Sequence, residues 1–191
     1  MKLQYYFSTT SPFCYYGNKR IFDMEKEFGI KWELKPYVIE QPADSSPPDP
    51  KELKHMTADI RRLAGYYKLE LTFPKGPPKG SLHKECFFIA NDAGKGKKYL
   101  IATNHAFWGK GIDISEINVL ADIAKSIGLD EKEFREKSGD PSLKERLKKS
   151  TEEGNADGVF GVPTLIVGNE LFWGQDRLEL VRAELAKVFK K

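Results

Sequence analysis

Strand-like patterns occur only near the two ends of this 191-residue chain, and their placement limits the possible folds. Residues 3–7 form a short apolar and aromatic run, and residues 30–38 largely alternate apolar with polar side chains. Residues 164–167 and 170–173 form two further runs joined by a Gly-Asn turn, which predicts a hairpin. The pattern between the first two and the last two strands is helical. All four strands can therefore share one sheet only if this helical segment leaves the sheet and rejoins it at neighbouring points. We therefore expect one continuous fold.

The N-terminal segment predicts a β-α-β unit. Between the first two strand patterns, apolar or small residues recur at steps of three and four, which marks one face of an amphipathic helix. These residues are Cys14, Gly17, Ile21, Met24 and Phe28. Gly29 follows as the expected end of the helix.

Helical patterns fill the middle of the chain, after a loop rich in proline and serine that leads into a helix near Pro50. Three apolar stripes follow: Leu53, Met56, Ile60 and Leu63; Cys86, Phe87, Ala90 and Ala93; and Ile117, Leu120, Ala124 and Ile127. Asp113 and Glu116 resemble a capping box ahead of the third stripe, Gly128 should end that helix, and Asp130 should cap the next. A last helix contains Leu178, Val181, Leu185 and Val188.

The resulting order of elements is typical of an α/β fold with an inserted helical block. We divide the chain into a sheet domain, made of residues 1–39 and 155–191, and an inserted helical subdomain of residues 40–154.

Charge and residue usage exclude several classes of protein. The 31 basic and 28 acidic side chains nearly cancel, and no basic stripe interleaved with aromatic residues suggests a nucleic-acid partner. The first residues enter a strand pattern at once and no apolar run has membrane-spanning length, so we expect a cytoplasmic protein without a membrane partner. Cys14 and Cys86 are far apart, which fits a reducing compartment, and His55, His83 and His105 are scattered, so no metal site is expected.

The segment Ser11-Pro12-Phe13-Cys14 has the spacing of a Cys-X-X-Cys motif in which oxygen replaces the first sulfur. A serine followed by a proline is also an ordinary way to begin a helix. A helix N-terminus, however, favours an anion and lowers the pKa of a thiol from about 8.5 to between roughly 3.5 and 7.5. Because the chain has no sulfur at the leading position, an exogenous thiol could take its place.

A second group of candidate residues begins with Val162-Pro163-Thr164 at the start of a strand. If Pro163 is cis, the backbone of Val162 is free to pair with an extended ligand, although a simple strand-start proline explains the motif equally well. Gln175 and Asp176 lie at the start of the final helix. They are either ordinary capping residues or a site for an α-amino group.

Together these motifs resemble the thioredoxin superfamily in its DsbA-like form. More narrowly, they are similar to the family of 2-hydroxychromene-2-carboxylate isomerases and kappa-class glutathione transferases. The segments SPF, GVFGVPT and LFWGQDRLELV carry the resemblance, which spans most of the chain. It implies a thioredoxin-like α/β fold with an inserted all-helical subdomain, and it suggests a homodimer.

The resemblance also implies that glutathione is the cofactor. Ser11 would hydrogen-bond its sulfur and favour the thiolate, Val162 before Pro163 would pair with its main chain, and Gln175 and Asp176 would hold its γ-glutamyl end. In an isomerase of this family the thiolate adds to an unsaturated carbonyl compound and is then expelled. A transferase leaves the adduct in place, and the sequence does not separate the two outcomes.

The chain departs from the family pattern near the loop at residues 40–52. Ser46 stands close to a position where the family has a glutathione-binding asparagine, and His55 replaces a tyrosine, while Asp59 and Arg62 keep the family spacing. We still expect a cofactor pocket, whereas these changes leave the substrate undefined.

Aromatic residues near the expected site suit a small aromatic or bicyclic substrate. We name Phe13 and Tyr15 as pocket residues, with Tyr16, Trp108 and Trp173 as further candidates. Core packing explains each of them equally well.

Two other functions stay open. A DsbA-like thiol-disulfide oxidoreductase would use Cys14 as a lone redox thiol, but the helical stripe that contains Cys14 equally predicts a small buried side chain. A non-catalytic binding module with the same fold is the third hypothesis. The presence of Ser11, Val162-Pro163 and Gln175-Asp176 together argues against it, because a scaffold does not need all three.

Overall fold

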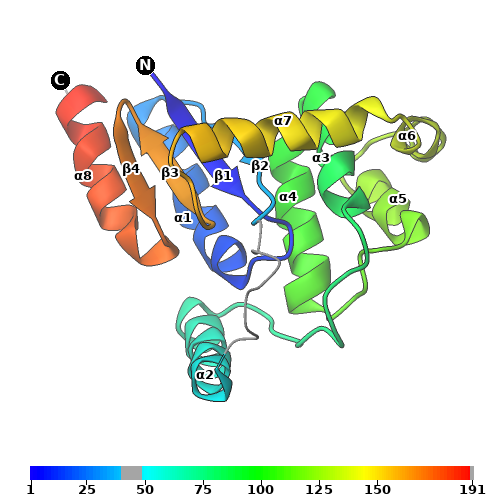
Figure 1. Ribbon diagram of the computed structural model, residues 1–191, viewed down its shortest axis with the longest axis horizontal. Helices are drawn as coiled ribbons and strands as arrows, with labels where there is room; N and C mark the ends of the chain where they lie inside the picture. Colours follow the sequence, from blue (N-terminus) through cyan, green and yellow to red (C-terminus); the bar gives the residue numbers. More distant parts are fainter. Residues whose placement is uncertain (40–48, 190–191) are drawn as a thin grey trace.

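The computed structural model describes residues 1–39 and 49–189, and its strands form one four-stranded sheet in the order β2-β1-β3-β4 (Figure 1). The strands are β1 (Leu3–Phe7), β2 (Glu33–Pro36), β3 (Thr164–Val167) and β4 (Glu170–Trp173). β1 is parallel to β2, whereas β3 is antiparallel to both β1 and β4. The two ends of the chain therefore share a sheet, as predicted, and the second strand is shorter than expected.

Helices make up most of the remaining chain. They are α1 (Pro12–Phe28), α2 (Pro50–Tyr67), α3 (Leu82–Asp92), α4 (Gly96–Asn104), α5 (Ile117–Ser126), α6 (Glu131–Ser138), α7 (Ser142–Ala156) and α8 (Leu178–Phe189). A π-helical turn, η1 (His105–Gly109), extends α4, and a 3-10 turn, η2 (Gln175–Arg177), precedes α8. The sequence pattern indicated neither turn.

Adjacent tyrosines of β1 connect the sheet to helices on its two faces, because successive strand side chains point in opposite directions. Tyr5 packs toward α1, where its hydroxyl donates to Asn18 Oδ1 at 2.8 Å. Tyr6 faces α7, and its hydroxyl donates to Asp157 Oδ2 at 3.1 Å, just beyond the end of that helix. Gly154 permits this approach, since a Cβ there would lie 3.0 Å from the Tyr6 ring. The sheet is thus covered on both sides.

Helix α7 also lies along the edge strand β2 and the residues that follow it. Ser150 Oγ donates to the Pro36 carbonyl at 2.7 Å, and Thr151 Oγ1 accepts from the backbone N–H of Val38 at 3.3 Å. The end of the helical block is therefore joined to this edge of the sheet by polar contacts, of which the bond from Ser150 is buried. The proposed domain boundaries at residues 39 and 155 stay a prediction.

The predicted capping box at Asp113 and Glu116 is wrong. Helix α5 has Glu116 at its N-cap position without a side-chain hydrogen bond, and Asp113 Oδ1 instead accepts from the backbone N–H and hydroxyl of Ser115. A short side chain that bonds two residues ahead forms a local turn in place of a cap. Gly128 and Asp130 behave as predicted, because α5 ends just before Gly128 and Asp130 Oδ1 accepts from Glu133 N at 2.8 Å.

The apolar stripe predicted on α2 is only partly buried. Ile60 is buried, but Leu53 and Met56 remain 48% and 41% exposed. Helix α2 lies at the periphery of the molecule (Figure 1), so only its second half packs against the rest of the chain. The spacing of apolar residues correctly identified α2 as a helix, but it did not show how much of the apolar stripe is buried.

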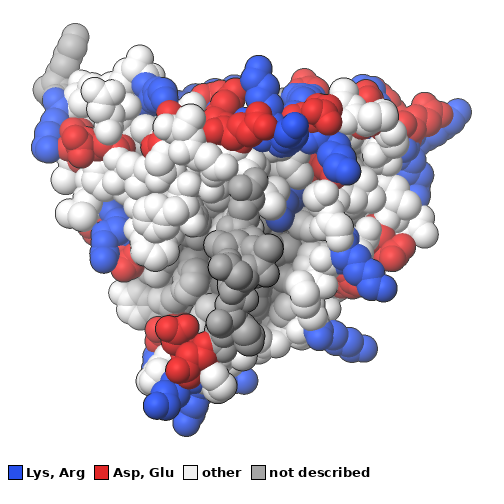
Figure 2. Space-filling model, viewed as in Figure 1, with Lys and Arg blue, Asp and Glu red and all other residues white. Residues whose placement is uncertain are grey.

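Charged side chains of both signs are mixed on the face shown in Figure 2, including along α7 at its upper edge. Within the described residues, none of the helices combines the length and apolar character needed to cross a membrane.

Candidate functional site

The candidate site is centred on Ser11, which begins α1. Ser11 has extended backbone angles, Pro12 occupies the first turn, and Ser11 Oγ accepts a hydrogen bond from Cys14 N at 3.2 Å. A hydroxyl that accepts a bond through oxygen still has its hydrogen to donate. Ser11 therefore caps the helix and keeps a donor at the positive end of the helix dipole, where an anion is favoured.

The Val162–Pro163 peptide bond is cis and lies at the same end of the sheet as Ser11. In the antiparallel pairing of β1 with β3, Tyr6 is opposite Thr164, so the carboxyl end of β1 adjoins the start of β3. Ser11 follows β1 by four residues, and Pro163 directly precedes β3. Within the described part of the chain, the backbone of Val162 makes no hydrogen bond, which leaves its polar groups for a ligand.

Gln175 and Asp176 lie in the 3-10 turn before α8, rather than in the helix itself. Gln175 is buried and reaches α1, where a Cβ on Gly17 would lie 3.4 Å from the Gln175 Cβ. Asp176 is exposed and pairs with Arg177 at 2.7 Å. The fold therefore brings Gln175 to the helix that Ser11 begins, while Asp176 faces outward.

The loop between β1 and α1 is held by a polar network from the helical block. Asn104 Nδ2 donates to the carbonyls of Ser8 at 3.3 Å and Thr9 at 2.6 Å, and Asn104 Oδ1 accepts from Asn18 at 2.8 Å. Trp108 Nε1 donates to the Thr10 carbonyl at 2.9 Å. These residues fix the backbone that leads to Ser11. The sequence analysis missed Asn104 and named Trp108 only as a candidate pocket residue. The sequence offered one signal for Asn104, which is a polar side chain within the largely apolar segment 99–108.

His83 is a further buried member of this network. Its Nδ1 lies 2.6 Å from Thr9 Oγ1, and its side chain is almost inaccessible to solvent. Burial, with a smaller effect of the Lys84 charge, lowers the pKa of His83 to about 4. The ring is thus neutral at physiological pH and acts as a hydrogen-bond partner.

We expect the free energy of unfolding to fall as the pH decreases from 6.5 to about 4. In that window the unfolded chain protonates His83 while the folded chain does not, so stability is lost by an amount on the order of 3 kcal/mol. Urea unfolding at pH 7 and pH 4 measures the loss. The His83→Gln variant should lose much less over the same range, whereas His55→Gln, at an exposed residue of α2, should follow the wild type. Equal pH dependence in all three chains would contradict the role of His83.

The two cysteines of the chain are buried. Burial raises the pKa of the Cys14 thiol, and this effect outweighs hydrogen bonds from the Ser8 backbone, Ser11 and Tyr5 that lower it. Burial and the nearby Glu85 raise the pKa of Cys86 to about 12. The raised pKa of each cysteine keeps its side chain in the thiol form. The complete burial of Cys14 agrees with a packing role.

We expect Cys14→Ala to retain at least about half of the wild-type activity, with a free energy of unfolding lower by about 1 to 2 kcal/mol through lost packing. In the native protein neither cysteine should react with a thiol reagent such as Ellman's reagent, and both should react in urea. Loss of activity in a Cys14→Ala variant that remains folded would instead support the oxidoreductase hypothesis.

The predicted aromatic pocket is only partly compatible with the structure. Tyr15 is buried, and its hydroxyl donates to the Glu70 carbonyl at 2.9 Å while its ring stacks on His105. Phe13 is half-buried beside Ser11, so it stays a candidate for substrate contact. Ser46 lies outside the described residues.

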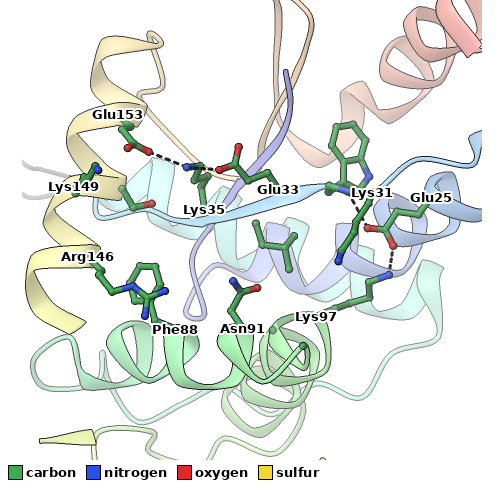
Figure 3. Close-up of a pocket in the computed structure, with 15 residues that line it drawn as sticks. Glu25, Lys31, Glu33, Lys35, Phe88, Asn91, Lys97, Arg146, Lys149 and Glu153 are labelled. Carbon is green, nitrogen blue, oxygen red and sulfur yellow. Dashed lines mark hydrogen bonds and ion pairs between the residues drawn. The ribbon is translucent and has the colours of Figure 1, made fainter. Parts of the chain in front are cut away.

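Elsewhere the described residues offer a cavity but no metal cluster. A cavity of about 810 Å³ opens among β2, α3, α4 and α7 (Figure 3), and none of the predicted site residues lines it. Two of its cations lie against carboxylates, since Lys35 pairs with Glu33 at 2.6 Å and Glu153 at 2.9 Å, and Lys97 pairs with Glu25. No group of three or more His, Cys, Asp or Glu side chains in residues 1–39 and 49–189 could hold a metal ion.

Comparison with known proteins shows similarity along almost the whole chain. Residues 2–186 match the family model described as DSBA-like thioredoxin domain. The 2-hydroxychromene-2-carboxylate isomerase of Sphingobium xenophagum is 29% identical over 190 residues, which cover 96% of this chain and 97% of that protein. Glutathione S-transferase kappa 1 of Homo sapiens is 23% identical, with 94% of this chain and 88% of that protein covered.

A solved structure of a 2-hydroxychromene-2-carboxylate isomerase has the same fold. It superposes with a TM-score of 0.86 at 24% sequence identity, and the match covers 98% of this chain and 96% of that one. The predicted thioredoxin-like fold with helices inserted between its strands is confirmed.

Proposed function

Because the chain belongs to the DSBA-like thioredoxin domain family, we propose that it is a glutathione-dependent enzyme that isomerises a small unsaturated carbonyl compound. The observation that carries this proposal is Ser11, which presents a hydroxyl donor at the start of α1 where the family's redox members need a cysteine sulfur. Three curated relatives named as 2-hydroxychromene-2-carboxylate isomerases support the reaction class.

The described residues fit a cysteine-containing peptide. Ser11 has a hydrogen to donate to sulfur, Val162 has unpaired backbone groups beside the cis bond, and the carboxamide N–H groups of Gln175 make no hydrogen bond within the described chain. We assign Ser11 to the sulfur, Val162 and Pro163 to the peptide backbone, and Gln175 with Asp176 to the γ-glutamyl end. When bound, glutathione supplies the thiolate nucleophile that the buried Cys14 and Cys86 do not.

The chain's own contribution is electrostatic. The Ser11 hydroxyl and the positive end of the α1 dipole stabilise negative charge on sulfur, so the pKa of a thiol held there falls. The polar network around the preceding loop fixes where the hydroxyl lies, and a fixed donor costs no reorganisation during the reaction.

Glutathione binding and product analysis test the proposal. Titration calorimetry with reduced glutathione should show binding, and the conversion of 2-hydroxychromene-2-carboxylate should require glutathione without consuming it. Consumption of one glutathione per product would instead identify a transferase, which the relative named glutathione S-transferase kappa 1 makes the second candidate. A chain that neither binds glutathione nor reacts with such electrophiles would overturn both.

We also propose that the protein is a cytoplasmic homodimer. The family resemblance suggests the dimer, and the exposed Leu53 and Met56 of α2 give it an apolar surface to bury. Sedimentation velocity of the wild type tests the oligomeric state.

A further inference from the structure

Arg20 carries a positive charge that no carboxylate of the described residues neutralises. It lies on α1, nine residues after Ser11, and is only partly exposed. Its Nη2 donates to the Gln175 carbonyl at 3.0 Å and to Gln175 Oε1, both of which are neutral groups. Its Nε is buried without a partner in the described chain. Because charges partly withdrawn from water are normally paired, the Arg20 charge is available to pair with an anionic group from outside the chain.

The contacts of Arg20 determine how Gln175 presents its carboxamide. An arginine has no acceptor, so the Gln175 atom beside Arg20 must be the oxygen. Tyr67 at the end of α2 supports the same orientation, because its hydroxyl lies 3.3 Å from Gln175 Oε1 and its ring lies 4.5 Å from the Arg20 guanidinium carbon. The carboxamide nitrogen is left with two donors and no partner in the described chain. Arg20 and Gln175 thus place positive charge and free N–H donors together.

We propose that Arg20 binds the α-carboxylate of the γ-glutamyl end of glutathione, acting with the carboxamide N–H of Gln175 that it orients. This assignment rests on the proposed function and extends it to a residue outside the motifs. The site would then recognise the free carboxylate of the peptide's amino-terminal residue, in addition to the thiol at Ser11. Thiols without that carboxylate would bind poorly even where their sulfur fits.

The test compares two ligands with wild-type and variant chains by titration calorimetry. The first ligand is reduced glutathione, and the second is 4-aminobutyryl-cysteinyl-glycine, which lacks only the α-carboxylate. Arg20→Met should weaken glutathione binding by about 10- to 100-fold, the range for loss of a hydrogen bond to a charged group. It should change binding of the second ligand by less than about threefold. Arg20→Lys keeps the positive charge but cannot donate two parallel N–H bonds to one carboxylate, as a guanidinium can. This variant should therefore bind glutathione with intermediate affinity.

Lys19→Met is the matched control, because Lys19 is the neighbouring α1 cation and pairs with Asp23 on the exposed side. It should leave both affinities unchanged. If Arg20→Met weakened both ligands equally, Arg20 would act only through the fold, and the assignment would be overturned. If it weakened neither, Arg20 would have no part in binding. A wild-type chain that binds no glutathione would instead remove the proposed function on which the assignment depends.

Discussion

Replacing Ser11 with alanine is expected to lower kcat/KM of the glutathione-dependent reaction by about 10²- to 10³-fold, the range for removal of one pre-placed donor to a reacting anion. The variant keeps the α1 dipole but has no O–H to donate to sulfur. The pKa of bound glutathione should rise accordingly, which ultraviolet thiolate absorbance measured against pH would show. Steady-state kinetics give the loss in rate.

Since Ser11 also caps α1, stability must be separated from chemistry. Loss of the cap alone costs about 1 kcal/mol. Ser11→Asp keeps an acceptor for the Cys14 N–H but has no donor and repels a thiolate, so it should be about as stable as the wild type and as inactive as Ser11→Ala. Ser11→Thr keeps both functions and should restore most of the activity. A fully active Ser11→Asp variant would rule out the donor role.

Replacing Asn104 with leucine is expected to lower the free energy of unfolding by about 3 kcal/mol. The new side chain has similar bulk but leaves the carbonyl of Thr9 and the amide of Asn18 without their partner in the buried network. Each buried polar group left unpaired costs about 1 to 3 kcal/mol. Urea unfolding at neutral pH measures the change.

Asn91→Leu is the matched control for this substitution, because Asn91 is an exposed residue of α3 in the same helical block. Its effect should stay within about 0.5 kcal/mol. Asn104→Leu should also lower kcat/KM under conditions where the variant is fully folded, since the loop before Ser11 loses its support. Similar unfolding energies for the two variants would contradict the network's importance.

Local patterns were sufficient for most of the fold. The hairpin at residues 164–173 and the helix from Pro12 to Phe28 follow from turn residues and spacing, and the structure confirms both. Burial was less predictable, because the stripe on α2 is correct as a helix but leaves Leu53 exposed. A stripe predicts that a helix has an apolar face, whereas its position in the molecule decides whether anything covers that face.

The candidate site likewise has parts that depend on local sequence and parts that depend on distant contacts. The position of Ser11 at the helix start depends on neighbouring residues and was predicted. For Pro163 at the strand start, the neighbouring residues left a cis bond and an ordinary strand-start proline equally open, and the structure has the cis bond. The supporting contacts of Asn104 and His83 reach Thr9 from 95 and 74 residues away. No local pattern specifies such partners, because they depend on how distant helices pack. Arg20 was missed for the same reason, since its partner is 155 residues away.

The dependence of the Ser11 loop on Asn104 and Trp108 bears on how this protein can change during evolution. The inserted helices do more than cover the sheet, because they supply the groups that hold the backbone before Ser11, the proposed catalytic residue. If this insertion were replaced by that of a relative, the residues that support the loop before Ser11 would be replaced with it. Any change in substrate preference would then come together with a change in that support. The two parts of the chain are expected to evolve as one unit, and chimaeras should work only when both sides of this contact come from the same parent.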